Sequence, residues 1–237
     1  MQIAYIVGGG LAFVGVLYGL SKLFGSSSDD GSDDDEAQGG PPLDTSIGTP
    51  SPWWTPDDYR AHVAASQRLG LNPANWLAIY RSESGLNPAA AFPQKDKNGV
   101  PLAVGIGQLT SAADGAAGIS EATRATIPTM SVAEQLPIFE KYMGSVLQGA
   151  TPDTAGGIYA FNFLPGPARA NGTAPDSVLG TVAEYPLDAG LDTNKDGTYT
   201  VSDLSQHLSQ YASDPLYLGA LQAMRDAVGD QSLSPTW

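Results

Sequence analysis

Cysteine is absent from the 237-residue chain, and charged residues are scarce, at 15%. The missing thiols exclude disulfide bonds, thiolate metal sites and a cysteine nucleophile. They leave an export route open, because exported proteins need not contain disulfides. In contrast, the chain has 28 glycines and 18 prolines. This composition predicts a loop-rich protein with a core of small residues rather than a coiled coil.

Positive charge is also scarce, since 11 Lys and Arg stand against 25 Asp and Glu, for a net charge of −14. Such a chain would be repelled by a nucleic-acid backbone, so we expect no nucleic-acid partner. Long runs that alternate between apolar and polar residues are missing as well, and apolar residues recur instead at helical spacing. The expected fold class is therefore mainly α.

Residues 1–24 form an apolar segment. No residue between Ile3 and Leu20 is charged, and at roughly 1.5 Å per residue this run would extend about 27 Å as a helix, close to the thickness of a bilayer core. We predict one transmembrane helix that contacts the membrane through residues 3–20. A cleaved signal peptide is the alternative, which is disfavoured because the only flanking base, Lys22, follows the apolar run.

Residues 25–52 are predicted to form an acidic linker rich in Gly and Pro. They contain a serine run, an acidic cluster from Asp29 to Glu36 and the sequence Gly39-Gly40-Pro41-Pro42. Such a segment cannot bury a core, and the repulsion between its charges extends it. We expect a tether that lets a folded domain search some distance from the membrane.

Folded character begins at Trp53, and we expect one helical domain over residues 53–180. Thr55, followed by Pro56 and two aspartates, has the pattern of a helix start. The predicted helices run from Pro56 to about Arg68, from Pro73 to Glu83-Ser84-Gly85, from Ser131 through Val146 and from Asp153 to Phe163.

Three short segments carry the candidate chemistry. The first, Glu83-Ser84-Gly85-Leu86-Asn87-Pro88, puts a carboxylate at a helix C-terminus. There the helix dipole and apolar neighbours raise a carboxyl pKa toward the value that a general acid needs. In the second, Gly105-Ile106-Gly107-Gln108, glycines let a ligand approach the backbone, and the amide both donates and accepts hydrogen bonds. The third, Tyr159-Ala160-Phe161-Asn162, places an amide in an apolar helix end.

Each segment alone also fits an ordinary helix end, Gly-rich turn or buried cap. In this order and spacing, however, the three resemble the goose-lysozyme-like domain of soluble-type lytic transglycosylases, including those of phage virions. Glu83 falls on the catalytic acid of the family's Glu-Ser-Gly block. Gly105, Ile106 and Gln108 fall on its Gly-Leu-Met-Gln block, in which Gly107 replaces the methionine and is expected to enlarge the floor of the cleft.

The third segment is similar to the family's Ala-Tyr-Asn block through Ala160, Phe161 and Asn162. Phe161 lacks the tyrosine hydroxyl, which Tyr159 or another tyrosine would have to supply. The resemblance implies a lysozyme-like α-helical domain with these substrate-binding residues: Ser84, Gly105, Ile106, Gln108, Tyr159, Phe161 and Asn162.

The resemblance also implies an enzyme that binds peptidoglycan glycan strands and uses no cofactor for catalysis. Glu83 would protonate the bond between N-acetylmuramic acid and N-acetylglucosamine, and then act as the base in closure to a 1,6-anhydro product. The expected location is the cell wall, either in a bacterial envelope or on a phage virion, with the chain anchored to a membrane.

Two other functions stay open. A hydrolytic muramidase of the same fold would need a second carboxylate across the cleft. The candidates are Asp96, Asp114 and Glu121, none of which lies in a recognisable block. A membrane-tethered protein that binds peptidoglycan without cleaving it is the other alternative, and the intact Glu83 block argues against it.

Residues 181–237 are predicted to hold a calcium loop and C-terminal helices. From Asp192 to Asp203, oxygen donors fall at positions 1, 3, 5, 7, 9 and 12, with Gly197 at position 6. This resembles an EF-hand loop with the final Asp typical of dockerin repeats, and a turn without metal is the alternative. The expected ligands of a structural Ca²⁺ are Asp192, Asn194, Asp196, Thr198, Thr200 and Asp203.

Helices are expected on the far side of this loop. One would run from Ser202 to Tyr211 and another from Pro215 to about Val228, and bound calcium would fix the latter against the catalytic domain. His62 and His207 each stand alone on a predicted helix. We predict that both lie at the surface and are neither metal ligands nor bases.

Overall fold

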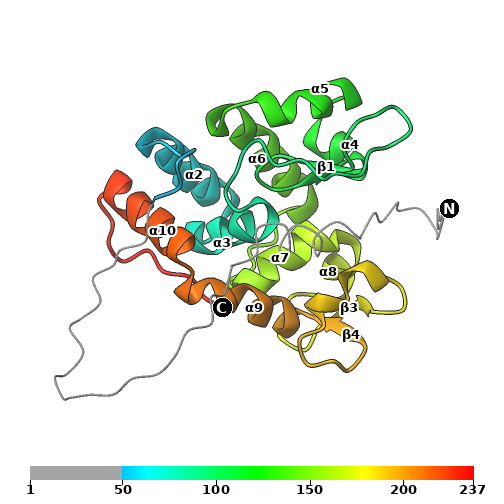
Figure 1. Ribbon diagram of the computed structural model, residues 1–237. Coiled ribbons are helices and arrows are strands. Elements are labelled where there is room, and N and C mark those ends of the chain that lie inside the picture. The colour runs from blue at the N-terminus through cyan, green and yellow to red at the C-terminus, as the bar shows by residue number, and fades with distance from the viewer. Residues whose placement is uncertain (1–49) are drawn as a thin grey trace, which may run out of the picture.

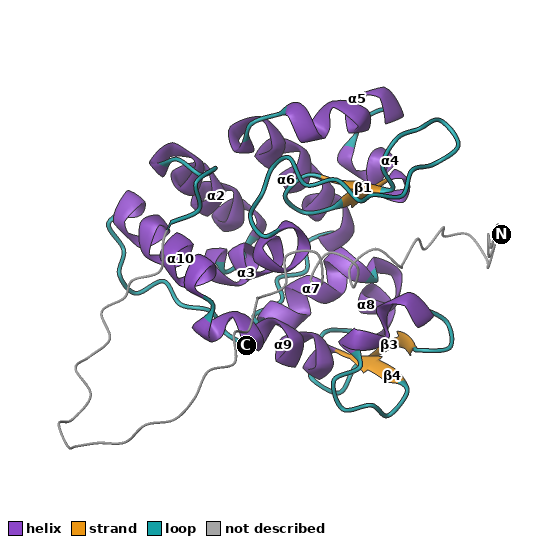
Figure 2. Ribbon diagram, in the orientation of Figure 1, coloured by secondary structure: helices purple, strands orange, loops and turns teal. Residues whose placement is uncertain are grey.

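The computed structural model describes residues 50–237, so the predicted anchor and nearly all of the predicted linker lie outside the described residues. Within residues 50–237, no helix is long and apolar enough to cross a bilayer. The expected mainly α fold class is confirmed (Figure 2). In this range the helices are α2 (Pro56–Leu69), α3 (Pro73–Ser84), α4 (Asp114–Ala117), α5 (Glu121–Thr126), α6 (Val132–Leu147), α7 (Ala155–Phe163), α8 (Pro165–Asn171), α9 (Val201–Ser209) and α10 (Pro215–Val228).

Short 3-10 helices and strands connect these helices. Two separate antiparallel ribbons are formed, one by β1 (Ala103–Val104) and β2 (Leu109–Thr110), the other by β3 (Val178–Thr181) and β4 (Thr198–Thr200). The β1–β2 hairpin therefore presents the Gly105–Gln108 segment as its turn. The 3-10 helices are η1 (Ser111–Ala113), η2 (Ile127–Thr129), η3 (Pro186–Leu191) and η4 (Gln210–Ser213).

The predicted helix starts are confirmed by their caps. Thr55 accepts a hydrogen bond from the Asp58 N–H, and the Asp58 carboxylate accepts one from the Thr55 N–H, which makes a capping box at α2. The Asn72 side chain caps α3 and Ser131 caps α6. These caps satisfy N–H groups that the first helical turn leaves without partners.

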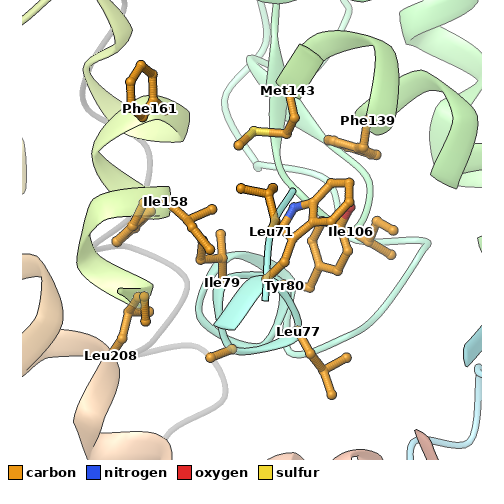
Figure 3. Close-up of a cluster of buried hydrophobic side chains, with 14 of the residues drawn as sticks. Leu71, Leu77, Ile79, Tyr80, Ile106, Phe139, Met143, Ile158, Phe161 and Leu208 are labelled. Atoms are coloured by element: carbon orange, nitrogen blue, oxygen red, sulfur yellow. The ribbon is translucent and has the colours of Figure 1, made fainter. Parts of the chain in front are cut away.

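Helix α3 lies at the centre of the molecule, beside α7 (Figure 1). Nearly all of its side chains are buried, because α2, α7, α9 and α10 pack around it. Figure 3 shows Ile79 and Tyr80 of α3 among Ile158 of α7 and Phe139 and Met143 of α6. A polar residue near the end of such a helix is therefore also removed from water.

The C-terminal helices contribute to the same hydrophobic cluster as α2, α3 and α7. The Tyr217 hydroxyl of α10 donates to the Ala74 carbonyl over 3.1 Å. Arg81 of α3 forms a two-pronged ion pair with Asp214, the N-cap of α10, at 2.8 and 2.7 Å. Residues beyond 200 therefore help to hold the helix that carries Glu83.

The prediction of a surface His62 is wrong. Its side chain is fully buried among Trp54, Trp76 and Tyr80, and its Nε2 lies 2.9 Å from the Pro73 carbonyl oxygen. Burial lowers the pKa of His62 to about 4, because the charged imidazolium is disfavoured away from water. The imidazole is thus a neutral part of the core at neutral pH.

Candidate active site around Glu83

The C-terminus of α3 is closed by two consecutive residues with left-handed backbone, Gly85 (φ 65°) and Leu86 (φ 64°). Their N–H groups donate to the Arg81 and Tyr80 carbonyls, and the Trp54 indole donates to the Leu86 carbonyl over 2.9 Å. A left-handed leucine is unfavourable, and such strained residues gather at functional sites. This closure fixes Glu83 in the last turn of α3.

The Glu83 carboxyl is almost fully buried, with 2% of the residue exposed. Burial raises its pKa well above the usual range, and the nearby charge of Asp188 raises the pKa further. The nearby Tyr159 and the hydrogen-bonded Asn162 act in the opposite direction and lower the pKa. Burial is the largest of these influences, and the raised pKa favours the protonated form that a general acid requires.

Asn162 is the residue of the third sequence segment that reaches Glu83. Its Nδ2 donates to Glu83 Oε1 over 3.0 Å. The backbone of Asn162 is held in turn, because the Tyr142 hydroxyl of α6 donates to its carbonyl over 2.9 Å. Asn162 is only partly buried, so its amide connects the enclosed carboxyl with the protein surface.

Tyr159 lies beside Glu83, and its hydroxyl is fully buried. The hydroxyl has no hydrogen bond of good geometry among the described residues, so its effect on the pKa of Glu83 arises from proximity. Phe161, which matches the family's tyrosine, lines a surface pocket of about 600 Å³ between α6, α7 and α8. Neither Glu83 nor Asn162 lines this pocket. The tyrosines near the candidate acid are Tyr159, Tyr142 and Tyr211, whose pKa values the charge of Glu83 raises.

The second segment is tied to the first beneath the surface. The Ser84 hydroxyl lies within hydrogen-bond distance of the Ile106 carbonyl, at 2.8 Å, and the Ile106 N–H donates to Gln135 Oε1 over 2.9 Å. Gln108 has a left-handed backbone, with φ 51°, and its Nε2 donates to the Gly105 carbonyl over 2.9 Å. Among residues 50–237 the buried Gln108 Oε1 has no hydrogen-bond partner, which leaves an acceptor for a ligand N–H.

The expected enlargement of the cleft at Gly107 is wrong. A Cβ at this position would lie 2.6 Å from the Phe139 ring, so α6 already fills the volume that a methionine side chain would take. Gly107 is required here by close packing rather than by an open floor.

The three candidates for a second carboxylate do not meet Glu83. Asp96 and Asp114 both pair with the buried Arg124, at 3.1 and 3.2 Å, and Glu121 accepts from Asn98 over 2.7 Å. The carboxylate that does act on Glu83 is Asp188, which is fully buried in η3 and belongs to no motif.

His207 also belongs to this region, and it is partly buried rather than fully exposed at the predicted surface position. Its Nε2 lies 3.0 Å from the Ser82 hydroxyl, and its ring stacks on Tyr159 with centroids 6.3 Å apart. Burial lowers the pKa of His207 to about 4. Ser82 precedes Glu83 directly, so the imidazole lies just behind the candidate acid.

The predicted calcium loop is compact. Asp192 accepts hydrogen bonds from the Asp196 and Gly197 N–H groups, and Asp203 accepts from Thr193 and Thr200. Gly197 has φ 89°, which suits the sharp turn at position 6. Oxygen donors at alternate positions fit a hard cation.

Across residues 50–237, no three or more His, Cys, Asp or Glu side chains are grouped so as to hold a metal ion. Calcium binding stays a prediction.

The comparisons with known proteins found no relative. No family model, curated protein or solved structure matches the chain. The candidate site therefore depends on its own geometry, on Glu83 above all.

Proposed function

We propose that this chain is a lytic transglycosylase that cleaves peptidoglycan, with a lysozyme-like helical domain and Glu83 as its single acid and base. One observation carries the proposal. The Glu83 carboxyl is buried at a helix C-terminus, its pKa is raised, and its Oε1 accepts from Asn162 at 3.0 Å. A protonated carboxyl held by one neutral donor has the properties of a general acid.

In the proposed reaction, protonated Glu83 donates its proton to the glycosidic oxygen between N-acetylmuramic acid and N-acetylglucosamine. The bond from the anomeric carbon to that oxygen breaks, and positive charge develops on the sugar. Glu83, now a carboxylate, takes the proton of the muramoyl C6 hydroxyl while O6 bonds to the anomeric carbon. The product is a 1,6-anhydro sugar, and Glu83 is again protonated.

Asn162 and Tyr159 would serve the second half of this cycle. Asn162 donates to the carboxyl, and both side chains lower its pKa, so they stabilise Glu83 most when it is ionised. Because only 2% of Glu83 is exposed, a glycan strand must displace neighbouring groups to reach it. The partly buried Asn162 would meet the strand first, and the buried, unpaired Gln108 Oε1 could accept from the strand only after neighbouring groups move.

The proposed membrane anchor, linker and calcium site are inferred from the sequence. Residues 3–20 would anchor the chain in a membrane, and the acidic linker would allow the domain to reach the wall of a bacterial envelope or a wall met by a phage virion. The Asp192–Asp203 loop would bind one structural Ca²⁺ through oxygen donors whose spacing and Gly197 turn suit that ion.

Hydrolysis is the second candidate, because Asp188 could supply the second carboxylate that it needs. A muramidase that uses two carboxyl groups needs one beside the acid, and Asp188 is buried close enough for its charge to raise the pKa of Glu83. In a transglycosylase the same charge would keep Glu83 protonated and stabilise the cationic sugar. Asp188 is compatible with both reactions, so only the reaction products can distinguish hydrolysis from transglycosylation.

The deciding experiment is mass spectrometry of muropeptides released from purified cell walls. We expect 1,6-anhydro products, and products heavier by one water would establish hydrolysis instead. Turbidity clearance with Glu83→Gln tests the residue itself. Equal clearance by this variant and the wild type would remove Glu83 from catalysis, and no clearance by the folded wild type would favour a protein that only binds peptidoglycan.

A further inference from the structure

Residues 234–237, called the strap below, are hydrogen-bonded to the starts of both α3 and α7. The Thr236 N–H donates to Asn75 Oδ1 over 2.7 Å, and the Thr236 carbonyl accepts from the Ala155 N–H over 2.7 Å. Asn75 lies in the first turn of α3, and Ala155 is the first residue of α7. A single residue of the strap therefore joins the two helices that carry Glu83 and Asn162.

Asn75 is the buried half of this junction. Its side chain is fully buried, and its Nδ2 donates to the carbonyl of Asp153, just before α7, over 3.3 Å. The strap is held a second time, because the Asn72 side chain donates to the Ser234 carbonyl over 2.8 Å. A buried amide is costly to leave without partners, so these bonds fix where the strap and the start of α7 lie on α3.

Helices α3 and α7 are thus linked at both ends. Their starts are joined through Asn75, and their ends are joined by the hydrogen bond from Asn162 to Glu83. The two helices therefore run side by side in the same direction (Figure 1). The two links are separated by roughly 12 Å along α3, a short and stiff length of helix. A shift of α7 along α3 at the first link would move Asn162 at the second.

The first turn of α7 also packs on α9. A Cβ on Gly156 would lie 2.5 Å from the Val201 carbonyl oxygen and 2.6 Å from the Ser205 nitrogen, so α7 and α9 touch through their backbones. This contact fixes the distance between α7 and α9. Apolar packing between α7 and α3 has no preferred direction, whereas hydrogen bonds do, so the strap decides how far along α3 the start of α7 lies.

We propose that the strap sets the register of α7 against α3 and thereby holds the Asn162 amide against the Glu83 carboxyl. Thr236 and Asn75 are its positioning residues, which act from the opposite end of the helix pair. The consequence for catalysis rests on the proposed function, because it assumes that Glu83 is the acid and base. The alignment of the two helices does not depend on that assumption.

The first test removes the N–H of the strap that Asn75 accepts. Thr236→Pro does so, because proline has no backbone donor. Thr236→Ala is the matched control, since the Thr236 side chain is exposed and alanine keeps the N–H. We expect kcat to fall about 3–10-fold in Thr236→Pro, up to the value of the Asn162 hydrogen bond, with KM little changed. Thr236→Ala should keep the wild-type kcat.

Asn72→Asp is a second variant, which leaves the backbone of the strap unchanged. Aspartate keeps the oxygen that caps α3 but lacks the Nδ2 that donates to the Ser234 carbonyl. It should lower kcat by a smaller factor than Thr236→Pro, because the bond to Asn75 remains.

Combination with Asn162→Ala separates positioning from general stability. A strap that acts through Asn162 has nothing left to position in this background, so Thr236→Pro should cause no further loss of kcat there. Losses that multiply in the double variant would overturn the inference. So would a Thr236→Pro variant with a lower Tm but the wild-type kcat, which would give the strap a purely structural role.

An NMR titration of the Glu83 carboxyl tests the strap without any measurement of activity, with the signal assigned by its loss in Glu83→Gln. The Asn162 hydrogen bond lowers the pKa of Glu83, so this pKa should rise in Thr236→Pro and stay unchanged in Thr236→Ala. An unchanged or lower pKa in Thr236→Pro would overturn the inference. If Glu83→Gln clears cell walls as the wild type does, the proposed function fails, and the titration still decides whether the strap positions Asn162.

Discussion

The amide of Asn162 donates a hydrogen bond to the carboxyl of Glu83 over 3.0 Å, across the contact between α7 and α3. This bond is the point at which two sequence segments far apart in the chain meet. It leaves Glu83 largely desolvated but with a neutral donor, an environment in which a carboxyl can both release and recover a proton.

Removal of that donor should shift the pH dependence of the reaction. The Asn162 hydrogen bond lowers the pKa of Glu83, so Asn162→Ala should raise this pKa and move the alkaline limb of the kcat/KM profile to higher pH. The maximal rate should fall about 10-fold, because the carboxylate loses one hydrogen bond. Asn98→Ala, which alters an exposed amide, is the matched control. An alkaline limb that moves to lower pH would contradict the assignment.

Glu83→Gln should be more stable than the wild type at neutral pH. The folded pKa of Glu83 lies above the unfolded value of 4.5, so above pH 4.5 the unfolded carboxyl ionises while the folded one stays protonated. Wild-type stability therefore falls as the pH rises from 4.5 toward the folded pKa, and Gln removes this loss. Urea unfolding at pH 4 and pH 7 measures the effect. The advantage of Gln should be present at pH 7 and small at pH 4, and the reverse order would mean that Glu83 is ionised in the fold.

Gly107→Ala should destabilise the protein by about 1–3 kcal/mol, because its Cβ would overlap the Phe139 ring at 2.6 Å. Gly115→Ala is the control, since no atom lies within 4 Å of a Cβ there and alanine favours a helix. Thermal unfolding of both variants, and of Gly107→Ala combined with Phe139→Leu, checks the prediction. The combination should recover part of the loss. Equal melting temperatures for the two single alanine variants would show that Phe139 moves aside freely.

Calcium should raise the melting temperature of the wild type over its value in chelator. A ligand that binds only the folded state at 100 times its Kd stabilises by about 2.7 kcal/mol. Asp192→Asn should abolish the increase, whereas Asp176→Asn, an exposed aspartate outside the loop, should retain it. The same melting temperature for the wild type in calcium and in chelator would reject a structural calcium site.

The sequence predicted the helix starts correctly, because the residues that determine them are close together in the chain. Thr55, Asn72 and Ser131 are followed within a few residues by the groups that they cap, so the starts of α2, α3 and α6 could be predicted. The meeting of Glu83 and Asn162 was expected from the resemblance and not from spacing, since no local rule brings α3 and α7 together.

The surroundings of single residues could not be predicted from local sequence patterns. His62 is enclosed by Trp54 and Trp76, and Gly107 by Phe139, so both depend on helices that pack from elsewhere in the chain. Asp188 lies in no motif. For His207 a signal was present, because Leu204 and Leu208 mark the buried face of α9 and position 207 falls beside them.

The close contact between α7 and α9 at Gly156 limits which segments of this protein could be exchanged with those of another protein. Any side chain at position 156 would collide with the Val201 carbonyl and the Ser205 nitrogen, so α7 and α9 can pack this closely only with glycine at that position. A chimaera that exchanged only the loop and the helices after it would join surfaces that were never fitted together. A chimaera should therefore exchange α7, which holds Asn162, together with α9, which holds His207.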